Sequence, residues 1–177
     1  MSGIVPSVET VIREHRDVIW RYLRHMGVRT EDVPDVFQDV LVVVARRLHE
    51  FEGRAALSTW IYRICWYQVR NHLRRRDAAR EVGEPWEGAE DANLEERVLQ
   101  AERLERFLAV LGIEERAIFV LYELYGFTFR EIGEQMGLTM GEVTSRHRSA
   151  RRRALEAARR LERQERRDER ERTDATP

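Results

Sequence analysis

The sequence predicts an all-α fold in which two small helical domains are joined by a flexible acidic linker. Only four prolines occur among its 177 residues, and apolar and polar residues show no clear period-two alternation, so helices are favoured over strands. A segment rich in acids and helix breakers interrupts the helical periodicity near the middle of the chain. The length is sufficient for one domain or for two domains of about 70 residues each.

The first domain is expected at residues 8–76. Its first helix ends at Gly27, a suitable C-terminal cap, and Pro34 falls in the first turn of the second helix, where a missing N–H costs little. Gly53 ends that helix. The three helices are expected at residues 8–26, 30–51 and 58–76.

Glycines, a proline and five acids between residues 81 and 91 indicate a flexible linker, expected at residues 77–95. Helical periodicity then resumes in a second domain, expected at residues 96–163. A charged tail follows at residues 164–177, where charge pairs can extend the last helix before it frays.

The composition excludes several classes of protein. Charged residues make up 36% of the chain and hydrophobic residues 42%, which fits neither a fully disordered chain nor a membrane protein. The longest run without polar residues, Val40–Ala45, is far shorter than the roughly 20 residues that span a bilayer, and no secretory signal opens the chain. The single cysteine, Cys65, excludes an internal disulfide and a multi-cysteine zinc site.

Charge is strongly segregated, although the formal net charge is only −1 and every basic residue is arginine. Residues 54–80 carry +6, from seven arginines and one acid; residues 81–105 carry −7, from nine acids and two arginines; residues 141–163 carry +5, from eight arginines and three acids. Basic segments attract phosphates because binding releases condensed counterions. Salt-bridged helix faces are the alternative explanation.

The strongest local signal is a repeated helix-start motif. Thr128 to Glu131 forms a capping box, in which the threonine caps the helix and the glutamate reaches back to the cap. The motif recurs eleven residues later at Thr139 to Glu142, and Gly137 between the two can adopt the positive φ of a tight turn. A short helix, a glycine turn and a longer helix predict a helix-turn-helix.

The second helix of this motif has the residues of a DNA-reading helix. We expect Val143, Ala150, Ala154 and Leu155 to anchor it, which leaves its threonine, serines and arginines exposed. The first residues of such a helix reach base edges, and flanking arginines contact phosphates. An ordinary helical hairpin with a basic face is the alternative. His147 has no histidine or cysteine at ligand spacing, so it is not expected to bind a metal.

Residues 57–76 have an apolar face, comprising Leu57, Ile61, Ile64, Cys65 and Leu73. The opposite face comprises Thr59, Arg63, Tyr67, Arg70 and Arg74, with Tyr62, Trp66 and Asn71 at its edges. Aromatic rings stack on bases and guanidinium groups pair with phosphates, so this pattern is typical of single-stranded nucleic-acid binding. Burial of Trp60, Tyr62 and Trp66 in a core or an interface is the alternative.

The helix expected at residues 30–51 also has two faces. Its apolar stripe comprises Val36, Val40, Val44, Leu48 and Phe51. The opposite stripe comprises Asp35, Gln38, Asp39, Val42 and Arg46. A valine within an acidic, amide-bearing face indicates a protein partner, and a plain solvated face is an equally good explanation.

In this order, the motifs resemble those of bacterial extracytoplasmic-function (ECF) sigma factors, a small two-domain class of transcription initiation factors. The stretch Asp35-Val-Phe-Gln38-Asp39-Val resembles the family's D-x-x-Q-[ED]-V signature, and Trp60-Ile-Tyr62-Arg63-Ile64 resembles W-[LI]-Y-R-I. Further on, Glu131-Ile-Gly-Glu and Gly141-Glu-Val143-Thr-Ser145-Arg146 resemble E-I-A-E and G-T-V-K-S-R. The resemblance covers about residues 8–155.

The resemblance implies three sets of contacts. Core RNA polymerase is an expected partner, through the clamp of its largest subunit and its flap region. The residues expected to bind the polymerase are Asp35, Gln38, Asp39, Val42 and Arg46, of which the first three would face the clamp. The opened minus-ten element, as non-template single strand, is expected to contact Gly53, Arg54, Ser58, Thr59, Trp60, Tyr62, Arg63, Tyr67, Arg70, Asn71 and Arg74. The minus-thirty-five duplex of the promoter is expected to contact Thr128, Thr139, Gly141, Glu142, Thr144, Ser145, Arg146, His147, Arg148, Arg151 and Arg152.

The resemblance also implies an anti-sigma factor that covers the polymerase-binding faces, and an acidic linker that runs through the polymerase towards the RNA path. The protein is expected in the cytoplasm, where an anti-sigma factor can hold it at the membrane without direct membrane insertion. Gly133 replaces a common alanine of the family and is expected only to loosen its helix.

No enzyme activity, cofactor or metal is expected, because the sequence has no glycine-rich phosphate loop, HExxH pair or nucleophile elbow. A plain helix-turn-helix regulator is the rival interpretation. In such a regulator the face of residues 57–76 would bind a ligand or a second copy of the chain, and nothing would require the pattern of Asp35 to Asp39.

Overall fold

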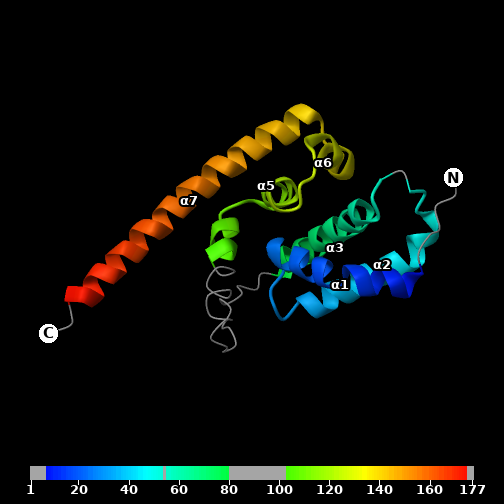
Figure 1. The fold of residues 1–177 in the computed structure, drawn as a ribbon, viewed down its shortest axis with the longest axis horizontal. Coiled ribbons are helices and arrows are strands. Elements are labelled where there is room, and N and C mark those ends of the chain that lie inside the picture. The colour runs from blue at the N-terminus through cyan, green and yellow to red at the C-terminus, as the bar shows by residue number, and fades with distance from the viewer. Residues whose placement is uncertain (1–6, 54, 80–102, 175–177) are drawn as a thin grey trace. The chain divides into compact units, whose positions relative to one another are not determined.

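A computed structural model of the chain describes residues 7–53, 55–79 and 103–174 (Figure 1). Contacts divide the chain into two units, residues 1–89 and 90–177. Every regular element within the described ranges is a helix, which confirms the all-α prediction. Most of the expected linker lies outside these ranges.

Unit 1 is built from α1 (Val8–His25), α2 (Val33–Arg47), the 3₁₀ turn η1 (Leu48–Glu50) and α3 (Leu57–Ala79). The hydroxyl of Ser7 accepts the N–H of Thr10 at 3.2 Å and so caps α1, and Gly27, with a φ of 86°, follows its end as predicted. Helix α2 begins later than expected because residues 30–32 form a turn. Helix α3 extends to Ala79, three residues beyond its expected end.

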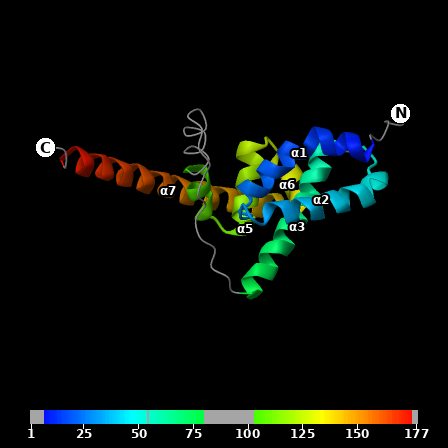
Figure 2. The same cartoon turned by 90° about the horizontal axis from the view of Figure 1, so that it is seen from below.

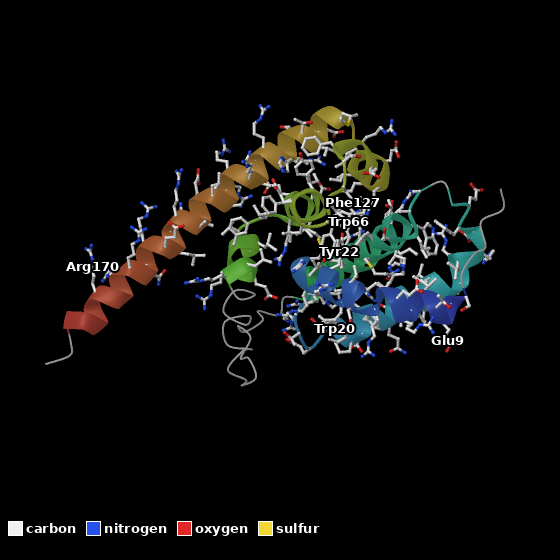
Figure 3. All side chains as sticks on the ribbon, in the orientation of Figure 1. Glu9, Trp20, Tyr22, Trp66, Phe127 and Arg170 are labelled. Carbon is white, nitrogen blue, oxygen red and sulfur yellow. The ribbon has the colours of Figure 1, made fainter. Side chains whose placement is uncertain are left out.

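The three helices of unit 1 pack against one another in pairs (Figure 2). Val36, Val40, Val44 and Leu48 are buried, as the apolar stripe predicts. Tyr22 and Trp66 are among the largest fully buried side chains (Figure 3). Cys65 is also fully buried, and burial raises the pKa of its thiol, so it is an inert core residue.

Unit 2 contains a helical segment at residues 103–109, then α5 (Ile113–Phe119), a π-helical turn η2 (Val120–Leu124), α6 (Phe129–Met136) and α7 (Met140–Asp174). Helix α7 packs against α5 and α6 and continues without interruption through the expected charged tail. Val143, Ala150 and Ala154 are buried as predicted. Leu155 is not an anchor, because it is 50% exposed.

Both capping boxes are present. Glu131 Oε2 accepts the N–H of Thr128 at 2.8 Å, and Glu142 Oε2 accepts the N–H of Thr139 at the same distance. In return each threonine hydroxyl accepts the N–H of its glutamate at 3.3 Å. These bonds satisfy donors that the first turn of each helix leaves free.

The turn between α6 and α7 depends on two glycines. Gly137 has a φ of 71°, as the turn prediction requires. Gly133 does more than loosen its helix, because a Cβ added there would lie 2.8 Å from the carbonyl oxygen of Leu138. The backbone N–H of Leu138 also donates to the Gly133 carbonyl at 2.9 Å. The absence of a side chain at residue 133 therefore allows the turn to fold back onto α6.

Candidate nucleic-acid interface

The outer face of α3 combines an aromatic ring with arginines. Arg63, Tyr67, Arg70, Asn71 and Arg74 are all exposed, and Tyr67 presents 41% of its surface. Towards the start of the helix, the predicted residues Ser58 and Thr59 are half-buried. This face can offer one ring for stacking and several guanidinium groups for phosphates.

Two aromatic residues at the edge of this face belong to the core instead. Tyr62 is 5% exposed, and its ring centroid lies 5.0 Å from that of Tyr22. Trp66 is 1% exposed. Trp60 is half-buried and packs on Phe51 at 5.8 Å. Tyr62 and Trp66 therefore support the α3 face from inside, and Tyr67 is its exposed ring. The predicted contact of Tyr62 with DNA stays a prediction.

The predicted site residues before α3 lie in a loop. Gly53 is exposed, with a φ of 69°, a conformation that L side chains rarely adopt. Arg54 lies outside the described residues.

The outer face of α2 agrees with its predicted pattern. Asp35, Gln38, Asp39, Val42 and Arg46 are all exposed, and Val42 presents 41% of its surface. The carboxylate of Asp39 lies 3.8 Å from the guanidinium of Arg75 on α3, but both side chains are more than half exposed, so this ion pair contributes little.

An open groove of about 610 Å³ lies between these two faces. Its walls comprise Asp39, Val42 and Val43 from α2 and Gln68, Asn71, Arg74 and Arg75 from α3. The acidic face of α2 and the arginine face of α3 therefore border one surface of unit 1.

Asp32, at the start of α2, joins the two helices beneath this surface. Its Oδ2 lies 3.1 Å from Arg29 Nε, 3.3 Å from His72 Nε2 and 3.6 Å from Arg76. Burial alone would raise the pKa of Asp32, but the hydrogen bond from Arg29 and the charges of Arg29, His72 and Arg76 outweigh it and lower the pKa. This cluster was not predictable from the sequence, because its members are up to 47 residues apart.

The outward face of α7 carries part of the predicted duplex-binding set. Gly141, Ser145, Arg148, Arg151 and Arg152 are exposed. Thr144 is half-buried, and its hydroxyl donates to the Met140 carbonyl at 2.8 Å. Thr128 and Thr139 are exposed, and both serve as helix caps.

The DNA contact predicted for His147 stays a prediction, but its side chain is largely buried and makes internal contacts. His147 is 9% exposed, and its Nε2 lies 3.0 Å from Glu123 Oε1. Its ring centroid lies 4.7 Å from that of Tyr122 and 5.1 Å from that of Phe129. His147 therefore holds α7 against η2 and α6.

Arg146 and Glu142 also make internal contacts. Arg146 lies 3.1 Å from Glu114 of α5 and is one-third exposed. The carboxylate of Glu142 accepts from the N–H and the hydroxyl of Thr139, and these hydrogen bonds lower its pKa. Both side chains position α7, whereas Arg148, two residues beyond Arg146, points outwards.

Glu115 forms the firmest link between α5 and α7. Its carboxylate accepts the hydroxyl of Ser149 at 2.8 Å and pairs with Arg153. Burial alone would raise the pKa of Glu115, but these contacts and the N–H of Gly112 lower it. The link fixes which side of α7 faces outwards.

Within the described residues, no group of three or more histidine, cysteine, aspartate or glutamate side chains could hold a metal ion. No helix in the same residues is both long and apolar enough to cross a membrane.

The fold and these surfaces define a two-unit helical protein with a carboxyl-terminal helix-turn-helix. Residues 11–79 match the Sigma-70 region 2 family, and residues 101–153 match the Sigma-70, region 4 family. The ECF RNA polymerase sigma-E factor of Escherichia coli K12 is 33% identical over 133 residues, covering 67% of this chain and 70% of the relative. The ECF sigma factor SigE of Mycolicibacterium smegmatis is 28% identical, covering 82% of this chain but only 59% of the relative.

A solved structure has a similar fold. The sigma factor RpoE of Bartonella quintana, in complex with the anti-sigma factor NepR, matches 85% of this chain and 96% of its own, with a TM-score of 0.67 and 17% identity. The chain belongs to the ECF sigma factors, which are transcription initiation factors that bind RNA polymerase and direct it to promoters.

Proposed function

We propose that unit 1 binds core RNA polymerase through the outer face of α2 and holds the opened minus-ten strand on the outer face of α3. The groove between these helices carries the proposal, because Asp39 and Val42 on one wall face Asn71 and Arg74 on the other. Polymerase bound to α2 would then lie beside a DNA strand on α3.

The chemistry of the α3 face suits a single strand with an extruded base. Extruding a base costs a few kcal/mol. Stacking on an aromatic ring returns about 1–3 kcal/mol per base, and Tyr67 is the exposed ring available. Arg63, Arg70 and Arg74 are placed to neutralise the phosphates of the same strand.

In unit 2, α7 reads the minus-thirty-five element in the major groove. Gly141, Ser145 and Arg148 face the base edges, and Arg151 and Arg152 contact phosphates. This assignment is supported by their exposure and by the internal contacts that Arg146 and His147 make with Glu114 and Glu123. Two weak DNA-binding surfaces on one chain together bind more tightly, because binding of the first raises the effective concentration of the second.

An anti-sigma factor is proposed as the partner that keeps the chain from polymerase. The RpoE structure is a complex with an anti-sigma factor, and that of CnrH, 24% identical with a TM-score of 0.62, is a complex with the cytosolic domain of CnrY. The exposed Val42 within the acidic face of α2 offers such a partner an apolar contact.

Run-off transcription tests the proposal, using bacterial core polymerase, this protein and the DNA upstream of its own gene. A defined transcript is expected. Asp39→Arg should abolish both the transcript and co-purification with core polymerase, whereas Glu14→Arg, the same charge change at an exposed site on α1, should leave both intact. Failure of the unaltered protein to bind core polymerase would favour a plain helix-turn-helix regulator.

The same assay tests base reading by Arg148 of α7. Arg148→Gln should lower the transcript about tenfold or more, since a good base contact is worth about 1–3 kcal/mol. Arg160→Gln, exposed further along the helix, is the matched control. Equal loss in both variants would count against base reading by Arg148.

A further inference from the structure

The outward face of α7 continues as a line of arginines far beyond the helix-turn-helix. Positions three or four residues apart lie on one side of a helix. From the start of α7, the positions on its outward side are Gly141, Ser145, Arg148, Arg152, Leu155, Arg159, Arg163, Arg166 and Arg170. All of these are exposed, and none is acidic. We call Arg148, Arg152, Arg159, Arg163, Arg166 and Arg170 the arginine stripe; Arg170 is marked in Figure 3.

The arginine stripe differs from the inner arginines of the same helix in its contacts. Arg146 and Arg153 are paired with Glu114 and Glu115 of α5. Among the residues that the structure describes, no ion pair joins a stripe arginine to an acid; the contact recorded for Arg163 is to the Arg159 carbonyl oxygen. Because the stripe arginines are exposed, an external anion can reach them.

The length and position of the stripe indicate which anion it meets. From Arg148 to Arg170 the helix rises about 33 Å, which exceeds the roughly 12 Å width of the major groove, so the stripe extends beyond the groove. The family match ends at residue 153, so most of the stripe lies beyond the part of the chain shared with the family. It nevertheless lies on the side of α7 that carries Gly141, Ser145 and Arg148, and thus continues the surface proposed to read DNA.

We propose that the later arginines of the stripe, from Arg159 to Arg170, bind the phosphate backbone of duplex DNA flanking the element that the first turns of α7 read. This proposal rests on the proposed DNA reading by unit 2. A straight helix cannot follow the curved major groove along its whole length, so the later arginines meet backbone phosphates and not base edges. The stripe thereby extends the DNA contact and adds affinity that does not depend on sequence.

The test measures how salt affects binding of the full-length chain to a 40-base-pair duplex of arbitrary sequence. Arg163→Gln/Arg166→Gln removes two stripe charges, and Arg160→Gln/Arg167→Gln removes two charges from a neighbouring side of the same helix segment. Each phosphate contact contributes about 0.9 to the slope of log affinity against log salt, so the stripe variant should lose about 1.8. The ratio of the affinity of the unaltered chain to that of the stripe variant should therefore fall about tenfold between 50 and 200 mM salt. Circular dichroism checks that both variants keep α7 helical.

The proposal stands if the slope of log affinity against log salt becomes smaller in the stripe variant only. Equal losses in both variants would overturn it, because they would indicate a general charge effect. An unchanged slope in the stripe variant, or no binding by the unaltered chain at 20 mM salt, would overturn it too and leave a protein partner as the better explanation. Since this assay contains neither polymerase nor promoter, failure of run-off transcription with an intact stripe effect would refute the proposed initiation function and not the stripe.

Discussion

Thr128 and Thr144 lie in the same helix-turn-helix, but their hydroxyls make different hydrogen bonds. The Thr128 hydroxyl caps α6 by accepting the N–H of Glu131, whereas the Thr144 hydroxyl donates to a carbonyl inside α7. Thr128→Ala should therefore destabilise unit 2 by about 1 kcal/mol, the usual value of an N-terminal cap. Urea unfolding followed by circular dichroism measures the change.

Thr144→Ala makes the same chemical change at a helix-interior site and serves as the control. It should be neutral or slightly stabilising, because alanine favours the helix and the lost bond is of a kind that slightly destabilises it. If Thr144→Ala lowers the free energy of unfolding as much as Thr128→Ala does, the cap at Thr128 makes no special contribution to stability.

Some features of single residues were predictable from the sequence, and others were not. The capping boxes were predictable because each depends on partners three residues apart. The burial of Tyr62 was an open alternative and that of His147 was not predicted, because periodicity places each residue beside an exposed face while the neighbours that bury it come from elsewhere in the chain. Tyr22 lies 40 residues before Tyr62, and Glu123 lies 24 residues before His147.

Lowering the pH tests how much Asp32 contributes to the packing of α2 against α3. The pKa of Asp32 is lowered in the folded protein, so its contribution to stability is present above its ordinary value of 3.8 and is lost as the pH falls through the lower folded value. Asp32→Asn should destabilise unit 1 by about 1–2 kcal/mol at neutral pH, because it removes charge-assisted hydrogen bonds. Between pH 5 and 3 the variant should lose less further stability than the unaltered chain.

Tryptophan fluorescence gives the readout for this experiment, because Trp20, Trp60 and Trp66 all lie in unit 1 and no tryptophan follows Trp86. Asp35→Asn, at an exposed site on the same helix, is the matched control and should follow the unaltered chain. Parallel pH curves for Asp32→Asn and the unaltered chain would contradict the assigned role of Asp32.

The existence and type of the regular elements were predictable from the sequence, but the residues at which some helices end were not. The order of apolar residues places each helix, yet α2 gives way to a 3₁₀ turn and α5 to a π-helical turn. These changes place Phe51 against Trp60 and bring Tyr122 and Glu123 to His147, so they depend on tertiary contacts. In contrast, the extension of α7 through the charged tail was predictable from its charge pairs.

The whole molecule combines two positive segments with a negative one, and this arrangement predicts competition within the chain. Residues 81–105 carry −7, and a tethered anion can occupy the arginines of either unit at a high effective concentration. Neutralising Glu87, Glu90 and Asp91 to glutamine, glutamine and asparagine should therefore tighten binding of the free chain to duplex DNA several-fold at 50 mM salt. The difference should vanish near 300 mM, where the Debye length falls to about 6 Å.

The control for this prediction neutralises Glu9, Glu14 and Asp17, three exposed acids of α1, and so makes the same change in net charge. If total charge alone governs DNA binding, the two triple variants will bind equally well. If the acidic segment competes with DNA, the variant at residues 87–91 will bind more tightly, and added salt will remove its advantage. Fluorescence anisotropy at the two salt concentrations distinguishes these results. In the second case, the segregation of charge along the chain would itself restrain the free factor from DNA.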